Sequence, residues 1–253
     1  MKKSLFLLTM TAALSLSAMA QTKMIAHRGA WKNTLAPQNS LASLQEAIQL
    51  KAWGSEFDVH LTQDDVLVVN HDHDFYGIDI ATATYAELLT KKHPNGESIP
   101  TAEEYLKAGL TQHGTKMIYE LKSSKAGKER TLKAARMSVD LVKQLHAEKL
   151  VEYILFDYEA CLAIKKAAPK AKVHYLNGDK SPKEIKAAKL DGIDYHITVY
   201  KKNPSWIQEA RGLKLKTNVW TVNTMDDINF FKAQHIDYIT TDEPEFVNKL
   251  LEK

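Results

Sequence analysis

The chain has 253 residues and a formal net charge of +3, from 34 Lys or Arg and 31 Asp or Glu residues. Because the two signs of charge are mixed along the sequence without a basic block, the composition argues against a nucleic acid or an anionic membrane surface as partner. The single cysteine, Cys161, excludes an intramolecular disulfide, and its apolar helical surroundings predict a small buried side chain rather than a nucleophile.

Residues 1–20 have the features of a secretory signal peptide. Lys2 and Lys3 precede an apolar stretch at residues 5–16, and Ala18-Met19-Ala20 forms a small-x-small cleavage site. A membrane anchor is the alternative, but the stretch is shorter than the ~20 apolar residues that span a bilayer. No cysteine follows the cleavage site to carry a lipid. We therefore expect an exported protein that begins at Gln21, has no stable membrane anchor, and stays in the periplasm or, as the alternative, is released.

Residues 21–253 are expected to form one domain in which short strands alternate with helices. The strand-like runs are Lys23–Ala26, 55–60, 117–121, 152–156, 172–176, 192–197, 217–222 and 237–241. The amphipathic segments between them include 40–51, 128–145, 157–168, 182–189, 204–211 and Met225–Ala233. This alternation predicts parallel strands joined by right-handed crossovers. Eight such units predict an α/β fold, a (β/α)8 TIM barrel, with a doubly wound open sheet as the competing topology.

The connection between the second and third predicted strands, residues 61–116, is longer than the others. It contains an extra predicted strand at 66–70, a helical piece near 85–89 and turn signals at Pro94-Asn95-Gly96. Long connections of this kind on a barrel are often functional. We expect a short excursion that helps to shape a substrate site.

Polar residues follow several of the predicted strands, at the end where the active sites of barrels lie. In chain order they are His27-Arg28, Glu56 with Asp58, Glu120 with Lys122, Trp220 with Asn223, and Thr241-Asp242. A site needs such a gathering of polar side chains at one end of a barrel, whereas a core does not.

The spacing of the acidic residues favours a metal site. Side chains at positions i and i+2 of a strand point to the same face, so Glu56 and Asp58 share a face, as do Glu120 and Lys122. If these faces line the barrel, three carboxylates lie close together, and a hard divalent cation would offset their repulsion. Acids that face outward into solvent are the alternative. Zinc is not favoured, because no cysteine or cluster of histidines accompanies the acids.

Two histidines are candidates for acid/base chemistry. His71 follows the extra predicted strand in the segment VVNHDHD, residues 68–74, and can lean over the mouth of the barrel towards His27. Each histidine taken singly is more often structural, but beside the carboxylates a catalytic role is favoured. We interpret His73 as a solvated neighbour, and His60, in phase with Glu56 and Asp58, as at most a supporting residue.

These motifs together resemble the glycerophosphodiester phosphodiesterase family. The resemblance is carried by His27-Arg28-Gly29, Pro37-Gln38-Asn39, Glu56-Phe57-Asp58-Val59, His71-Asp72, Glu120-Leu121-Lys122, Trp220-Thr221-Val222-Asn223 and Thr241-Asp242-Glu243-Pro244. Each motif is weak alone, but the ordered set covers nearly all of the chain after residue 20 and is highly specific.

The resemblance implies a TIM barrel that hydrolyses glycerophosphodiesters, as small-molecule substrates, to sn-glycerol 3-phosphate and an alcohol. It implies one divalent cation, Ca²⁺ or Mg²⁺, held by Glu56, Asp58 and Glu120. It further implies His27 and His71 as the acid/base pair, with Arg28 and Lys122 on the phosphate and Trp220 as a wall of the site. The implied nucleophile is a glycerol hydroxyl, which forms a cyclic phosphate that water then opens.

One departure and two alternatives accompany this interpretation. The family usually has an acidic residue where this chain has Gln38, and threonine where it has Ser40, so Gln38 is not assigned as a metal ligand. A related phospholipase-type enzyme acting on intact lipid would be expected to present an exposed apolar rim. A non-catalytic glycerophosphodiester-binding protein would be expected to have lost a histidine or an acid, and both histidines and all three acids are present.

Overall fold

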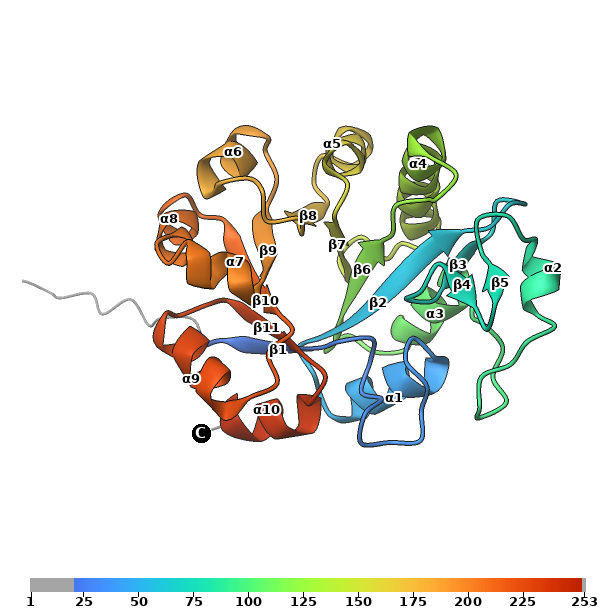
Figure 1. Cartoon of the computed structure of the whole chain (residues 1–253), viewed down its shortest axis with the longest axis horizontal. Coiled ribbons are helices and arrows are strands. Elements are labelled where there is room, and N and C mark those ends of the chain that lie inside the picture. The colour runs from blue at the N-terminus through green and yellow to red at the C-terminus, as the bar shows by residue number, and fades with distance from the viewer. Residues whose placement is uncertain (1–20, 252–253) are drawn as a thin grey trace, which may run out of the picture.

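The computed structural model describes residues 21–251, and Figure 1 shows their arrangement. The predicted signal peptide, residues 1–20, lies outside the described residues. Within residues 21–251, no helix is long and apolar enough to cross a membrane.

Eight parallel strands form a closed ring. They are β1 (Lys23–Ala26), β2 (Gly54–Leu61), β6 (Lys116–Leu121), β7 (Val151–Leu155), β8 (Lys172–Tyr175), β9 (Gly192–His196), β10 (Lys216–Trp220) and β11 (Tyr238–Thr241). Each strand pairs with its neighbours in this order, and β1 pairs with both β2 and β11. The pairing of the first strand with the last closes the sheet, so the predicted TIM barrel is confirmed and an open sheet is excluded.

Helices surround the ring of strands (Figure 1). They are α1 (Leu41–Gln49), α2 (Tyr85–Leu88), α3 (Ala102–Gly109), α4 (Lys128–Gln144), α5 (Tyr158–Ala167), α6 (Pro182–Ala187), α7 (Ile197–Lys202), α8 (Trp206–Gly212), α9 (Met225–Ala233) and α10 (Pro244–Leu251). Several begin at a side chain that accepts a hydrogen bond from the first turn, such as Ser40 before α1 and Asp157 before α5. Such caps satisfy backbone N–H groups that the helix itself leaves free.

Three helices differ from the elements that the sequence pattern predicts. Helix α3 lies inside the long connection, although the capping box of Thr101 and Glu104 marks its start. Helix α7 begins directly after β9, at Ile197, which the sequence pattern assigned to the end of the strand at 192–197. Helix α10 begins at Pro244 and packs beside β1.

The excursion between β2 and β6 folds beside the barrel. Strand β3 (Leu67–Val69) pairs antiparallel with β2, and β4 (Asp74–Phe75) pairs with β5 (Ile78–Asp79) as a small hairpin. The excursion has a small core of its own, with Val68, Phe75, Ile80, Leu88 and Ile99 buried together. The predicted strand at 66–70 and the helical piece near 85–89 therefore both occur, and the excursion ends where α3 returns to the barrel.

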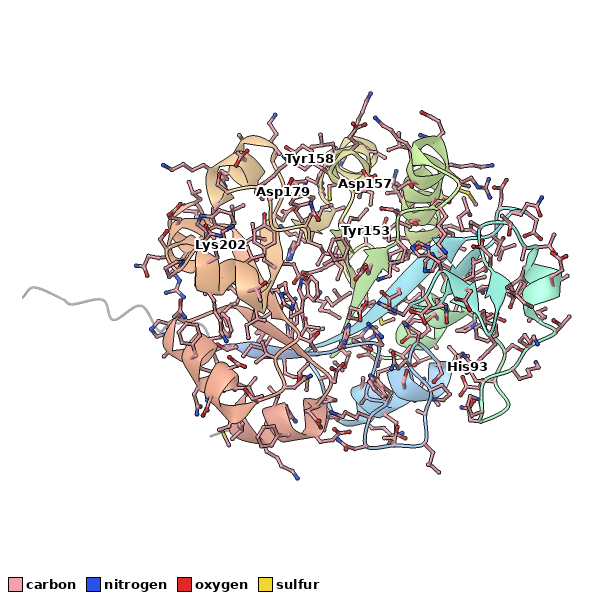
Figure 2. All side chains as sticks on the ribbon, viewed as in Figure 1. His93, Tyr153, Asp157, Tyr158, Asp179 and Lys202 are labelled. Atoms are coloured by element: carbon pink, nitrogen blue, oxygen red, sulfur yellow. The ribbon has the colours of Figure 1, made fainter. Side chains whose placement is uncertain are left out.

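Alternate residues of each barrel strand face opposite sides. Phe57 of β2 stacks on Tyr105 of α3, with ring centroids 4.6 Å apart, and therefore faces the helices. Tyr153 of β7 also points outward, and its hydroxyl donates to the Ser138 carbonyl of α4 (Figure 2). The residues between these positions point into the barrel, where Ile118 and Ile154 are buried. This alternation directs Glu56, Asp58 and Glu120 inward.

Candidate active site

The turn after β1 directs a backbone N–H towards the acids of β2. Arg28 has φ of 58° and Gly29 has φ of 80°. A Cβ atom at Gly29 would lie 2.7 Å from the backbone carbon of Ser43, so only glycine fits against α1. In this conformation the Arg28 N–H donates to Glu56 Oε2 at 2.8 Å. The motif His27-Arg28-Gly29 is thus a tight turn that attaches the first strand to the second.

Three carboxylates meet inside the mouth of the barrel. Glu56, Asp58 and Glu120 are all buried, and each offers an oxygen within 4.8 Å of the others. Asp58 and Glu120 are direct neighbours in the register of β2 and β6. The solvated, outward-facing arrangement considered from the sequence is therefore excluded.

Two cations accompany the carboxylates. Lys122 Nζ lies 2.7 Å from Asp58 Oδ1 and 2.5 Å from Glu120 Oε1, and Arg28 Nε lies 3.8 Å from Asp58 Oδ2. Burial opposes ionisation of Asp58, but Lys122, His71 and Arg28 together outweigh it and lower the pKa of Asp58 to about 2. Burial also opposes charge on Lys122, yet Asp58 and Glu120 raise the pKa of its ammonium group. One carboxylate and one cation of the site therefore stay charged at neutral pH.

The pKa values of the other two acids, Glu56 and Glu120, are raised by burial and by repulsion within the cluster. Burial, followed by the charge of Asp58, raises the pKa of Glu56 well above its usual value. The same two causes raise the pKa of Glu120 to about 7. Glu56 Oε1 is buried and has no hydrogen-bond partner among the described residues. An orphaned oxygen beside two further carboxylates fits a hard divalent cation, which would supply the missing positive charge.

Both candidate histidines are oriented by a carboxylate. His27 Nδ1 lies 2.7 Å from Asp242 Oδ1, and His71 Nδ1 lies 2.7 Å from Asp72 Oδ1. A carboxylate at Nδ1 favours the proton on that nitrogen and leaves Nε2 as the reactive atom. His27 Nε2 lies 4.0 Å from Glu56 Oε2, at the edge of the carboxylate cluster.

His71 is held at the barrel mouth by its backbone. Its carbonyl oxygen lies 3.2 Å from His60 Nε2, so His60 supports the segment that carries His71. Burial lowers the pKa of His60 to about 4, which keeps this support uncharged. Burial also lowers the pKa of His71, although the charge of Asp58 opposes the shift. A neutral imidazole at His71 can accept a proton at neutral pH.

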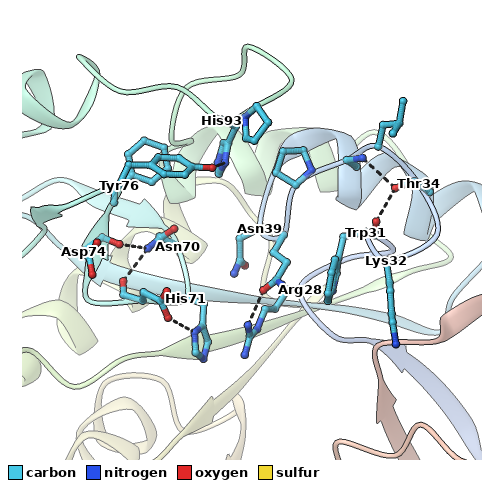
Figure 3. A pocket seen from close by; sticks show the side chains of 17 residues that line it. Arg28, Trp31, Lys32, Thr34, Asn39, Asn70, His71, Asp74, Tyr76 and His93 are labelled. Atoms are coloured by element: carbon cyan, nitrogen blue, oxygen red, sulfur yellow. Dashed lines mark hydrogen bonds and ion pairs between the residues drawn. The ribbon is translucent and has the colours of Figure 1, made fainter.

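Two adjoining cavities share Arg28 and His71. The inner cavity has a volume of about 250 Å³. The predicted site residues that line it are His27, Arg28, Glu56, His71, Glu120, Lys122 and Trp220, and Asp58 does not line it. The outer cavity, of about 630 Å³, lies between the excursion and the loop that joins β1 to α1. Figure 3 shows Arg28 and His71 at its base, with Tyr76 and His93 on the excursion side and Trp31 on the loop side.

Comparison with known proteins agrees with this geometry. The model of the glycerophosphoryl diester phosphodiesterase family matches residues 27–246. A solved glycerophosphodiester phosphodiesterase from Parabacteroides distasonis is 43% identical, with a TM-score of 0.90 over 92% of this chain and 98% of that chain. The chain belongs to this family.

Two more distant similarities each cover 92% of the chain. A glycerophosphodiester phosphodiesterase from Caldanaerobacter subterraneus is 28% identical over 92% of this chain and 99% of its own length. A phosphodiesterase from Oleispira antarctica, solved in complex with the product sn-glycerol-3-phosphate, has the same fold. It is 24% identical, with a TM-score of 0.79 over 92% of this chain and 98% of its own.

Gln38, which stands where the family usually has an acidic residue, contacts the guanidinium of Arg28. Arg28 Nη1 donates to Gln38 Oε1 at 2.6 Å, so the amide orients the guanidinium without neutralising it. Gln38 lines the outer cavity but not the inner one.

Four residues of the site were not assigned from the sequence. Asp72 and Asp242 orient the histidines, and Asn39 holds Asp58 by two hydrogen bonds of 2.8 and 3.0 Å. These three lie within the quoted motifs, so a signal was present. Asp194 of β9 lines the inner cavity and belongs to none of those motifs.

Proposed function

We propose that this protein hydrolyses glycerophosphodiesters to sn-glycerol 3-phosphate and an alcohol, using a divalent cation. The observation that carries the proposal is the convergence of three buried carboxylates and two carboxylate-oriented histidines around one cavity, in a chain of this family. Calcium and magnesium both suit an all-oxygen site, and the assay below compares them.

The proposed ligands of the cation are Glu56, Asp58 and Glu120. When bound, the cation offsets charge that builds on the non-bridging oxygens of the phosphate. Arg28 and Lys122 line the same cavity and add positive charge to it. Trp220 forms part of the wall, where its indole N–H donates to the Asp194 carbonyl at 3.0 Å and the ring meets Phe156 edge to face.

His27 and His71 are proposed to move the protons. One imidazole takes the proton of the glycerol hydroxyl next to the phosphate, whose oxygen then attacks phosphorus. The bond from phosphorus to the alcohol oxygen breaks, and the other imidazole gives that oxygen a proton. Water next opens the cyclic phosphate: it loses a proton to one histidine, and the glycerol oxygen regains one from the other. The protein then needs no nucleophile of its own, and buried Cys161 takes no part.

The outer cavity is proposed to receive the alcohol half of the substrate. It meets the inner cavity at Arg28 and His71, so a diester whose phosphate lies between them extends into both. The lining of the outer cavity is mixed: Asn70, Asp72 and Asp74 suit a hydrated alcohol, and Leu35, Phe75 and Tyr76 add apolar surface.

The direct test is release of glycerol 3-phosphate from glycerophosphocholine, with EDTA, Ca²⁺ or Mg²⁺ added. Turnover should need a divalent ion and should be lost in His27→Ala. The matched control is His113→Ala, because His113 is exposed in the loop before β6. A diester without a hydroxyl next to the phosphate should be a poor substrate. Absence of turnover with every divalent ion would refute the proposal, and preference for intact phospholipid micelles would favour the phospholipase alternative.

A further inference from the structure

Asp194 is an acid of the inner cavity that the proposed chemistry does not use. It lies on β9 between Ile193 and Tyr195, which are buried in the main core. Its side chain therefore points into the barrel, where it lines the inner cavity. In the closed ring, β9 is separated from β2 by β6, β7 and β8 on one side and by β1, β11 and β10 on the other. Asp194 thus stands opposite the strand that carries Glu56 and Asp58.

The surroundings of Asp194 differ from those of the three clustered acids. Its side chain is 1% exposed, and it makes no ion pair within residues 21–251. Its Oδ1 atom has no hydrogen-bond partner there. Burial raises the pKa of Asp194 to about 8, although Asn218 partly offsets the rise. At neutral pH the group is therefore mostly an uncharged acid that can both donate and accept a hydrogen bond.

The wall around Asp194 is mostly apolar. Ile154, Phe156 and Leu176 line the same cavity from β7, β8 and the residues that follow them. Thr240 is also present, but its hydroxyl already accepts a hydrogen bond from Asn218 Nδ2 at 2.8 Å. Asp194 and its neighbour Asn218 each keep a buried Oδ1 atom without a hydrogen-bond partner among the described residues, and of the two only Asp194 lines the inner cavity.

We propose that Asp194 binds the terminal hydroxyl of the glycerol moiety and thereby selects glycerol among other diols. This inference rests on the proposed function for the identity of the substrate. The phosphate lies with the cations on the β1, β2 and β6 side, and the adjacent hydroxyl reacts there. The remaining hydroxyl is the group farthest from phosphorus, and it reaches the opposite wall. The inner cavity, about 250 Å³, is below the ~300–1,000 Å³ of pockets for drug-sized ligands, so it suits a moiety as small as glycerol.

The inference predicts discrimination against a substrate that lacks only this hydroxyl. The probes are glycerophosphocholine and the analogue in which propane-1,2-diol replaces glycerol, which keeps the hydroxyl next to the phosphate. The wild-type protein should favour glycerophosphocholine by about 10- to 100-fold in kcat/KM, because the analogue leaves a buried polar group unpaired. Asp194→Leu should reduce this ratio to near one, by lowering turnover of glycerophosphocholine alone. Asp194→Asn, which keeps a hydrogen-bonding side chain of the same shape, should retain most of the ratio.

The matched control is Leu176→Ala, which alters the same cavity without a polar contact. Leu176→Ala should change kcat/KM for both substrates by the same factor. If Asp194 had only a structural role, Asp194→Leu would also change both values by the same factor. Calorimetry with sn-glycerol 3-phosphate and 2-hydroxypropyl phosphate repeats the comparison without turnover. A wild-type protein that treats the two ligands alike, or an Asp194→Leu protein that still distinguishes them, overturns the inference. If neither diester is cleaved but the binding preference depends on Asp194, the proposed function fails while the inference stands.

Discussion

Replacing Asp242 by asparagine should stop His27 from acting as a base while leaving its position unchanged. Asp242 Oδ1 faces His27 Nδ1, and Asn223 Nδ2 donates to Asp242 Oδ2 at 2.8 Å. Because Asn223 presents a donor, the carbonyl oxygen of the introduced amide must take the Oδ2 position. Its NH₂ group then faces Nδ1, which forces that nitrogen to accept and places the ring proton on Nε2. Nε2 is the atom that should take the proton.

The expected loss in kcat is about 10²- to 10⁴-fold, the range of a general acid–base contribution. This corresponds to about 3–5 kcal/mol of transition-state stabilisation, at about 1.4 kcal/mol per tenfold change. Asp242 supports a loss of this size because only 22% of its side chain is exposed and Asn223 holds its second oxygen. The introduced amide is therefore held with its NH₂ group towards His27 Nδ1, and water cannot easily take over the role of the lost carboxylate oxygen.

Asp72→Asn provides the contrast within the same molecule. Asp72 also meets a histidine Nδ1 at 2.7 Å, but its side chain is 75% exposed, and within residues 21–251 no second residue holds its carboxylate. The introduced amide can turn its carbonyl oxygen towards His71, so the loss should be below about fivefold, as for an exposed pair worth up to ~1 kcal/mol.

The assay is kcat for glycerol 3-phosphate release at saturating glycerophosphocholine and neutral pH, with thermal melting to show that each variant folds. The reasoning is refuted if Asp242→Asn keeps kcat within about threefold of the wild type, since a base contributes at least ~10²-fold. It is also refuted if Asp72→Asn loses as much as Asp242→Asn.

Three further predictions concern the metal, the stability of the site and the N-terminus. Addition of Ca²⁺ or Mg²⁺ should raise the melting temperature of the wild type, and Glu56→Gln should lose this response; an equal shift in the variant would count against Glu56 as a ligand. Asn39→Ala should lower the free energy of unfolding by about 2–4 kcal/mol in urea titrations, because it removes a donor to buried Asp58 at a residue with φ of 58°. The control, exposed Asn33→Ala, should cost less than about 0.5 kcal/mol, and equal losses would contradict the argument. We also propose export, so mass spectrometry of the protein from the periplasmic fraction should find Gln21 at its N-terminus, and recovery of the uncleaved chain from the cytoplasm would oppose this.

The sequence by itself determined the order of the barrel and most of its candidate site. Buried parallel strands need apolar runs, and helices need amphipathic ones. The alternation of strands and helices can therefore be predicted from the sequence alone. The spacing of Glu56 and Asp58 likewise predicts that both side chains point to one face of the strand, since the pleat repeats every two residues. Short helix α7 was missed because its first residues, 197–199, are β-branched and disfavour a helix locally, so its formation depends on the surrounding structure.

Only the tertiary structure decided which polar groups meet across strands that are distant in the chain. His27 and Asp242 are 215 residues apart, and their contact requires the closure of β1 against β11. Asp194 belongs to none of the quoted motifs, and its position opposite the carboxylates in the inner cavity depends on the closed ring of strands. The physical reason is that local patterns record the direction of a side chain relative to its own strand. Distances, burial and the resulting charge states depend on where the ring of strands closes.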